Sequence, residues 1–162
     1  MKLALCTAAA AVLFASVPAL AASKHEAAFL KEAMEGDNSE TTLGSIAAQR
    51  GGSNGVRRFG RMLATDHRKG KAEASAVARR LHVPVTNRMA NEAIAERSKL
   101  RHLRGSGFDR EFARYMVKDH KSDIAKFSKE ASSRDNAEVV ALARKTLPVL
   151  RKHLRTAESL ER

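Results

Sequence analysis

Four side chains that can bind a metal fall at equivalent places along four helical stretches of the chain. Each stands near the middle of a stretch in which small and apolar residues recur every three or four positions: Glu40, His67, His120 and His153. This recurrence is typical of a helix face that turns toward a core. A carboxylate or an imidazole on such a face is costly to bury unless it is paired or coordinated. Four of them, one per helix, indicate a shared purpose.

One carboxylate and three imidazoles could hold a single divalent metal such as zinc, iron or copper, with neutral ring nitrogens as donors. Asp66 and Asp119 directly precede two of the histidines. Because neighbouring helix residues point about 100° apart, neither aspartate can orient the histidine that follows it. Each could instead support a histidine of an adjacent helix from outside the ligand set. The alternative is a buried hydrogen-bond network of the same residues without a metal.

A common site also requires the four groups to lie at one height in the bundle. Counted from the connecting turns at about 1.5 Å per residue, Glu40 and His67 differ by roughly 6 Å, and His120 and His153 by roughly 9 Å. Offset or tilt of the helices would have to close these gaps. Pro148, about one turn before His153, is expected to bend the last helix. Such a bend would also change the height of His153 along the bundle.

A two-metal oxidase centre is not indicated. Di-iron bundles take a Glu-x-x-His motif from each of two helices, because two metals need bridging carboxylates. Here the positions three residues before the histidines are Ala64, Val117 and Leu150. The sequence also contains no nucleophile elbow and no glycine-rich phosphate loop, so no catalytic motif is predicted. The other histidines fall at predicted helix ends or in a weakly patterned segment, where solvation is expected: His25, His82 and His102.

The composition indicates an all-α domain. Only 4% of the residues are aromatic, and nine glycines and three prolines leave little material for an all-β fold. Ser23 and Glu26 have the spacing of a capping box and open a helix that runs to about Arg50. Ser106 and Asp109 have the same spacing and are expected to open a later one. The predicted long helices cover about 23–50, 55–82, 106–132 and 135–162, with at most one short helix over 91–103.

These helices are joined by a short, a long and a short connection. Short connections produce antiparallel neighbours, whereas about 25 residues between the second and third helices can travel the length of a bundle. The sequence therefore predicts a ferritin-like four-helix bundle with a long connection between helices 2 and 3.

A set of short motifs is shared with a known family: Phe29-Leu30-Lys31-Glu32-Ala33, Glu40 with Leu43-Gly44, Phe59 before Met62, Asp66-His67, Phe108-Asp109, Asp119-His120, and Leu147-Pro148 followed by His153. Through them the run over 29–153 resembles the bacterial ferritin-like family catalogued as domain of unknown function 4142, whose members are often labelled outer membrane proteins. The resemblance implies an envelope or periplasmic four-helix bundle without an established activity. From the family and the location we expect a role in metal handling or envelope stress.

The first 21 residues read as a secretory signal peptide. Lys2 precedes an apolar run, which ends at Pro18 and a small-residue site, Ala19-Leu20-Ala21. Cleavage is predicted before Ala22, which leaves a mature domain of residues 22–162 in the periplasm or outside the cell. The single cysteine, Cys6, lies inside the leader. The mature domain is therefore expected to have neither disulfides nor cysteine ligands.

The chain is strongly basic, with a formal charge of +12, or +11 without Lys2. The second predicted helix carries most of the excess, because residues 53–82 hold eight Lys and Arg residues against two acids. Such a face is either solvated or binds an anionic membrane surface or another polyanion. No nucleic acid is expected as a partner, since the chain is exported and lacks aromatic residues for base stacking. An alternative function is thus a non-enzymatic basic envelope protein with purely structural core histidines. The oligomeric state is not predicted.

Overall fold

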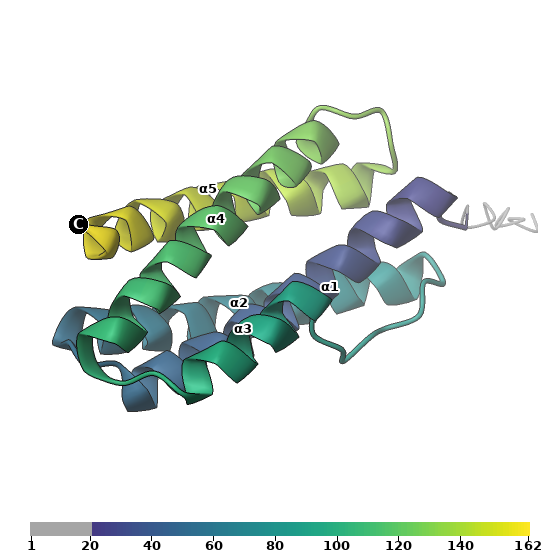
Figure 1. Ribbon diagram of the computed structural model, residues 1–162. Coiled ribbons are helices and arrows are strands. Elements are labelled where there is room, and N and C mark those ends of the chain that lie inside the picture. The colour runs from purple at the N-terminus through teal and green to yellow at the C-terminus, as the bar shows by residue number, and fades with distance from the viewer. Residues whose placement is uncertain (1–20) are drawn as a thin grey trace, which may run out of the picture.

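The all-α prediction is confirmed in the computed structural model, which describes residues 21–162 and contains no strand in that range (Figure 1). The predicted signal peptide and Cys6 lie outside the described residues, except for Ala21. No helix among the described residues is long and apolar enough to cross a membrane. The five helices are α1 (Lys24–Arg50), α2 (Asn54–Arg80), α3 (Asn91–Arg101), α4 (Gly105–Ala131) and α5 (Ala137–Glu161).

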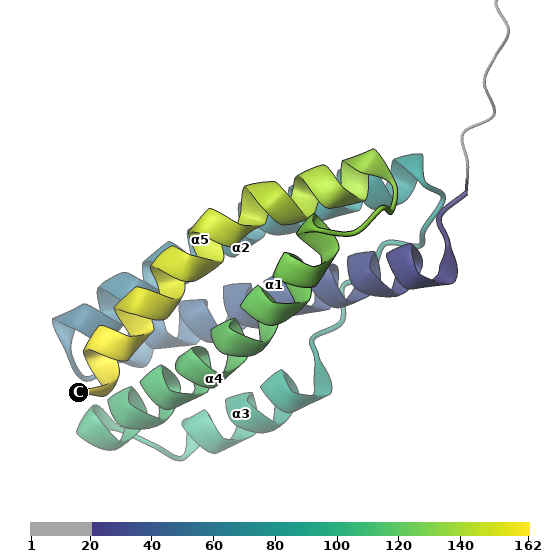
Figure 2. The same cartoon turned by 90° about the horizontal axis from the view of Figure 1, so that it is seen from above.

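The long helices form two antiparallel hairpins, α1 with α2 and α4 with α5 (Figure 1). The hairpins meet through α2 and α5, which lie side by side in the view from above (Figure 2). The short helix α3 lies in the connection between the hairpins and packs against α1 and α4. The domain is therefore a helical bundle with one additional short helix along its side.

The connection between α2 and α4 runs the full length of the bundle. At one end, the backbone N–H of Ala22, before α1, donates to the carbonyl of Leu81, just after α2. At the other end, Arg50 at the end of α1 donates to the carbonyl of Arg101, shortly before α4. Consequently α2 and α4 run in the same direction. The predicted order of a short, a long and a short connection is confirmed.

The predicted capping box at the start of α1 is present. The Ser23 hydroxyl accepts from the backbone N–H of Glu26, and the Glu26 carboxylate accepts from the backbone N–H of Ser23 at 2.7 Å. The other Glu26 oxygen accepts from the backbone N–H of Asn136, which precedes α5, at 2.7 Å. One buried carboxylate thus joins the starts of two helices that are distant in sequence.

The predicted capping role of Ser106 and Asp109 is wrong. Helix α4 begins at Gly105, and its N-cap residue, Arg104, has no side-chain cap among the described residues. The Asp109 carboxylate instead accepts the backbone N–H groups of Gly52 and Ser53, both at 2.7 Å. Both N–H groups lie just before the first residue of α2, so the Asp109 carboxylate lies at the positive end of that helix, whose own first turn contains no acid.

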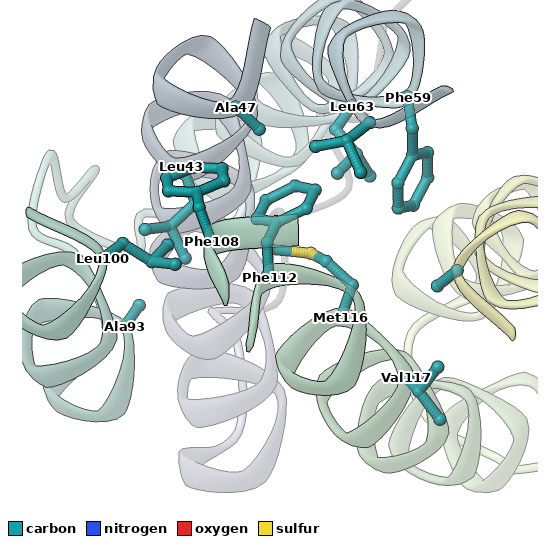
Figure 3. Close-up of a cluster of buried hydrophobic side chains, with 12 residues drawn as sticks. Leu43, Ala47, Phe59, Leu63, Ala93, Leu100, Phe108, Phe112, Met116 and Val117 are labelled. Atoms are coloured by element: carbon teal, nitrogen blue, oxygen red, sulfur yellow. The ribbon is translucent and has the colours of Figure 1, made fainter. Parts of the chain in front are cut away.

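The apolar core is divided along the bundle axis. One cluster lies where α1 turns into α2, and Figure 3 shows its side chains converging from α1, α2, α3 and α4. Two further clusters lie toward the other end, one among α1, α2 and α5 and one among α1, α4 and α5. The largest side chains of the first cluster include Leu43, Phe59, Leu63, Phe108, Phe112 and Met116.

Two glycines set the distance between α1 and α2. A Cβ atom on Gly60 would lie 2.5 Å from the carbonyl oxygen of Gly44, and a Cβ atom on Gly44 would lie 2.7 Å from the carbonyl oxygen of Gly60. The two backbones therefore touch at this crossing. Any larger residue at either glycine would force the two helices apart. The crossing lies one turn from Glu40 and about two turns from His67, so it also controls how these two residues approach each other.

We predict that Gly60→Ala lowers the free energy of unfolding by about 1–3 kcal/mol, because the added methyl group clashes with backbone atoms that cannot move independently. Gly107→Ala is the matched control, since a Cβ atom there would meet no other described atom within 4 Å. The control should leave stability unchanged or raise it by up to about 1 kcal/mol. Urea unfolding measures both, and equal stability of the two variants would contradict the close crossing.

Candidate metal centre

The structure brings the four sequence-predicted ligands into one layer of the core. Glu40 is 1% exposed, His67 is buried, and His120 and His153 are fully buried. The centroids of the three imidazole rings are 5.1 to 5.9 Å apart. One ring nitrogen from each histidine lies within 4.8 Å of the other two. Stagger and tilt of the helices therefore close the height differences counted along the sequence.

Glu40 faces two of the three histidines. Its Oε2 atom lies 2.6 Å from Nε2 of His67, and its Oε1 atom lies 3.2 Å from Nδ1 of His120. The close contact with His67 is a buried ion pair when that ring is protonated. Glu40 also forms a second group of ligand atoms, with Asp119 and His120, that lie within 4.8 Å of one another. The carboxylate thus contacts the histidine cluster from two sides.

One nitrogen of each imidazole is held by an oxygen outside the cluster. Such outer hydrogen bonds fix the orientation of a ring and the position of its proton, and they accompany most metal-binding histidines. The pairs are His67 Nδ1 with Asp37 Oδ1 at 2.9 Å, His120 Nδ1 with the Met116 carbonyl at 2.9 Å, and His153 Nε2 with Asp66 Oδ2 at 3.0 Å.

The other nitrogen of each ring is buried and has no hydrogen-bond partner within residues 21–162. These atoms are His67 Nε2, His120 Nε2 and His153 Nδ1, and both oxygens of Glu40 share their condition. A buried polar atom without a partner costs about 1–3 kcal/mol. His67 Nε2 and the Glu40 oxygens are in ion-pair contact, which leaves His120 Nε2 and His153 Nδ1 without a polar partner among the described residues. A cation bound in this layer would satisfy both nitrogens.

The two aspartates that the sequence offered as outer partners occupy different places. Asp66 of α2 bonds His153 of α5, a histidine on an adjacent helix. Asp119 lies beside Glu40, and burial together with the charge of Glu40 raises the pKa of Asp119 to about 9. Asp119 is therefore favoured in its protonated form, so it adds little negative charge to the layer at neutral pH.

Sequence reasoning missed Asp37 and Asp123. Asp37 stands three residues before Glu40 and therefore on the same face of α1. This spacing could have identified Asp37 as a residue of the site. Gly70 makes room for it, because a Cβ atom there would lie 2.7 Å from Asp37 Oδ1. Asp123 stands three residues after His120, and burial, with the charge of Glu40, raises its pKa to about 7.

Without a metal, the layer contains one buried ion pair, between Glu40 and His67, and two neutral rings, those of His120 and His153. Burial alone would raise the pKa of Glu40, but the neighbouring rings of His120 and His67 outweigh it and hold the pKa at about 2. Burial alone would lower the pKa of His67, but Glu40 and Asp37 outweigh it and raise the pKa to about 10. Burial, reinforced by the charge of His67, lowers the pKa of His153 to about 4, and burial also lowers that of His120.

Two cavities reach this layer. One of about 190 Å³ is lined by Glu40 and His67 at its inner part and by Phe29 and Phe127 along its wall. A wider cleft of about 620 Å³ follows α1 and α4 and is lined by Asp119, among others. The layer is therefore buried but not sealed from the surface.

The comparisons place the chain in a family and support the fold. The sequence profile of the family described as "Domain of unknown function (DUF4142)" matches residues 12–160. The crystal structure of a DUF305 fragment from Deinococcus radiodurans superposes with a TM-score of 0.76 at 21% sequence identity, over 87% of this chain and 97% of that chain. At that identity the likeness concerns the fold alone. None of the functionally curated proteins matches the chain.

We predict that in the metal-free protein the ring of His67 keeps its proton up to about pH 10, whereas the ring of His153 stays neutral down to about pH 4. A raised pKa of His67 stabilises the folded state fully below pH 6.5, and this stabilisation is lost as the pH rises through about 10. An NMR titration of the ring signals, recorded with a chelator present, measures both values. Titration of His67 near pH 6.5 would show that the ion pair with Glu40 does not form.

Proposed function

The chain belongs to the family of domain of unknown function 4142, and from its core we propose that it is an exported, ferritin-like helical bundle that binds one divalent metal ion. His67, His120 and His153 are the ligands, and Glu40, which faces two of them, completes the set. Export is supported by the leader-like residues 1–21. The ferritin-like assignment is supported by four long helices with one full-length connection. We propose that the protein acts in metal handling or in the response to envelope stress.

The proposal rests mainly on two inward ring nitrogens that lack partners among the described residues. Without a metal, Glu40 and His67 stabilise each other as an ion pair. Nε2 of His120 and Nδ1 of His153 remain buried and without a hydrogen-bond partner. A metal ion satisfies these two atoms and replaces the proton of His67, so it explains the whole layer.

The donor set and its dimensions fit a transition metal. Zinc binds imidazole nitrogen at about 2.0–2.1 Å, which places two ligand nitrogens of a tetrahedral site about 3.3 Å apart. One nitrogen of each histidine lies within 4.8 Å of the others, so the nitrogens would have to approach one another by up to about 1.5 Å to reach this spacing. Imidazole with carboxylate suits zinc, iron and copper. When bound, such an ion supplies Lewis acidity or, if it is iron or copper, electron transfer.

The remaining residues of the site orient the donors and exclude water. Asp37, Asp66 and the Met116 carbonyl hold the outer ring nitrogens, so the inner nitrogens face the common centre. The negative charge of Glu40 offsets that of a bound cation. Phe59 lies against the ring of His153, with centroids 6.2 Å apart, and shields one side of the layer. Shielding from water strengthens the attraction between these charges.

We predict that the purified protein, prepared without a histidine tag, carries one zinc ion that the His120→Asn variant lacks. His102→Asn, at an exposed position, is the matched control and should retain the wild-type zinc content. Added zinc should raise the melting temperature of the wild type and of the control more than that of His120→Asn, because binding to the folded state stabilises it. Equal zinc content and equal thermal shifts in all three proteins would contradict a metal centre in the core.

A second candidate function rests on the outer face of α2. Six basic residues of α2 are exposed, and at 100° per residue they fall within about 120° of the helix circumference. The two acids of the helix, Asp66 and Glu73, lie outside this sector and are half-buried. Arg80 forms an ion pair with Glu138 of α5, and the other five residues present positive charge suited to an anionic membrane surface or another polyanion. The residues of the face are Arg58, Arg61, Arg68, Lys69, Arg79 and Arg80.

We predict for this candidate that the protein is retained on vesicles containing anionic lipid, that salt weakens the retention, and that replacing Arg61, Arg68 and Arg79 by Gln removes most of it. The control replaces three exposed basic residues of α4 and α5 by Gln, at equal loss of charge: Arg110, Lys152 and Arg155. Equal retention on neutral and anionic vesicles, or equal loss in both triple variants, would count against a specific basic face.

A further inference from the structure

A second group of metal-binding side chains lies at the end of the bundle where α1 begins and α4 ends. His25 Nε2 is 3.2 Å from Glu130 Oε2 and 3.4 Å from Asp135 Oδ2. One ligand atom from each of the three lies within 4.8 Å of the others. The sequence predicted a solvated His25. The side chain is indeed 56% exposed, but it lies against two carboxylates more than 100 residues away.

The two carboxylates are poorly compensated by the described residues around them. The Glu130 side chain is 1% exposed, and its second oxygen has only a 3.4 Å contact with the Ser133 hydroxyl. Oδ2 of Asp135 is buried and has no hydrogen-bond partner in residues 21–162. Burial raises the pKa of Glu130, and the charge of Asp135 raises it further. A cation between the two oxygens would offset both charges at once.

Two residues of this group, His25 and Glu130, line the 190 Å³ cavity whose lining also includes Glu40 and His67 of the core layer. Asp135 lies beside His25, outside the lining. Phe29 and Phe127, with ring centroids 5.0 Å apart, form part of the same lining. Gly36, whose missing side chain leaves space beside Asp123, also contributes. The outer group and the core layer thus share one continuous space.

We propose that His25, Glu130 and Asp135 form a second site for a divalent cation at the mouth of this cavity, and that metal ions load the core through it. One imidazole and two carboxylates suit zinc, iron(II) or manganese(II). The exposure of His25 leaves the bound ion open to solvent and therefore exchangeable. The loading role rests on the proposed core site, whereas cation binding at the outer site does not.

Equilibrium dialysis of the untagged protein against zinc tests the outer site. We expect two zinc ions per chain in the wild type, one in His25→Ala/Asp135→Asn, one in His120→Asn, and none in the combined variant. Both outer substitutions change side chains that are at least partly exposed. Glu130→Gln, which keeps the shape of the buried side chain, is a second probe and should also lose one ion. His102→Ala/Glu158→Gln replaces a histidine and neutralises a carboxylate elsewhere and should retain two zinc ions.

The outcomes separate the two sites. A single zinc ion that is lost only with His120→Asn overturns the outer site, reduces His25 to an ordinary ion-pair partner, and leaves the core proposal standing. A single zinc ion that is lost only with the outer variants supports the outer site and contradicts the core proposal. Equal zinc content in the wild type and both outer variants also overturns the inference.

The loading role is tested by the rate at which Co²⁺ reaches the core. The chain has one tyrosine and no tryptophan, and Tyr115 lines the cleft with Asp119, next to the core layer. Quenching of Tyr115 fluorescence by Co²⁺ therefore reports core occupancy. We expect His25→Ala/Asp135→Asn to slow this quenching by about tenfold or more, since the site concentrates cations at the mouth. The control double variant should load at the wild-type rate, and an unchanged rate in the outer variant overturns the loading role.

Discussion

The burial of ionisable groups in the middle of the bundle is the constraint on which the rest of the structure depends. Glu40, His67, His120 and His153 form a layer with apolar clusters on both sides along the bundle. The side chains of this layer are almost entirely shielded from bulk solvent, so each group needs a partner from the protein, an enclosed water molecule or a bound ion. The outer ring nitrogens have hydrogen-bond partners, whereas the inner nitrogens of His120 and His153 have none among the described residues. The proposed metal ion would satisfy both of these nitrogens.

The packing around the layer serves to place its donors. The Gly44 and Gly60 crossing lets α1 and α2 touch, which brings Glu40 against His67. Gly70 leaves the space in which Asp37 reaches the other side of the same ring. The long connection returns α4 beside α1, and α5 then supplies the third histidine. The same packing leaves a cavity between the layer and the end of the bundle, where further ligand atoms gather.

The helices and the inward positions of the four groups could be predicted from sequence because both depend on local spacing. The long connection followed from the same pattern. Height in the bundle could not be predicted, since stagger and tilt depend on how side chains pack, and the counted gaps of roughly 6 and 9 Å are closed in the structure. Asp109 was predicted to help open its own helix, whereas its hydrogen-bond partners, Gly52 and Ser53, lie in the turn between α1 and α2. His25 likewise had no local signal for its contact with Glu130.

Anomalous diffraction from crystals of the zinc-loaded protein is the decisive measurement for a metal site in the core. We expect a peak at the zinc edge in the core layer, between the rings of His67, His120 and His153, with Glu40 beside it. A core without such a peak in crystals that contain excess zinc, with His67 hydrogen-bonded to Glu40 and water or side-chain atoms at the inner nitrogens of His120 and His153, would rule the metal site out.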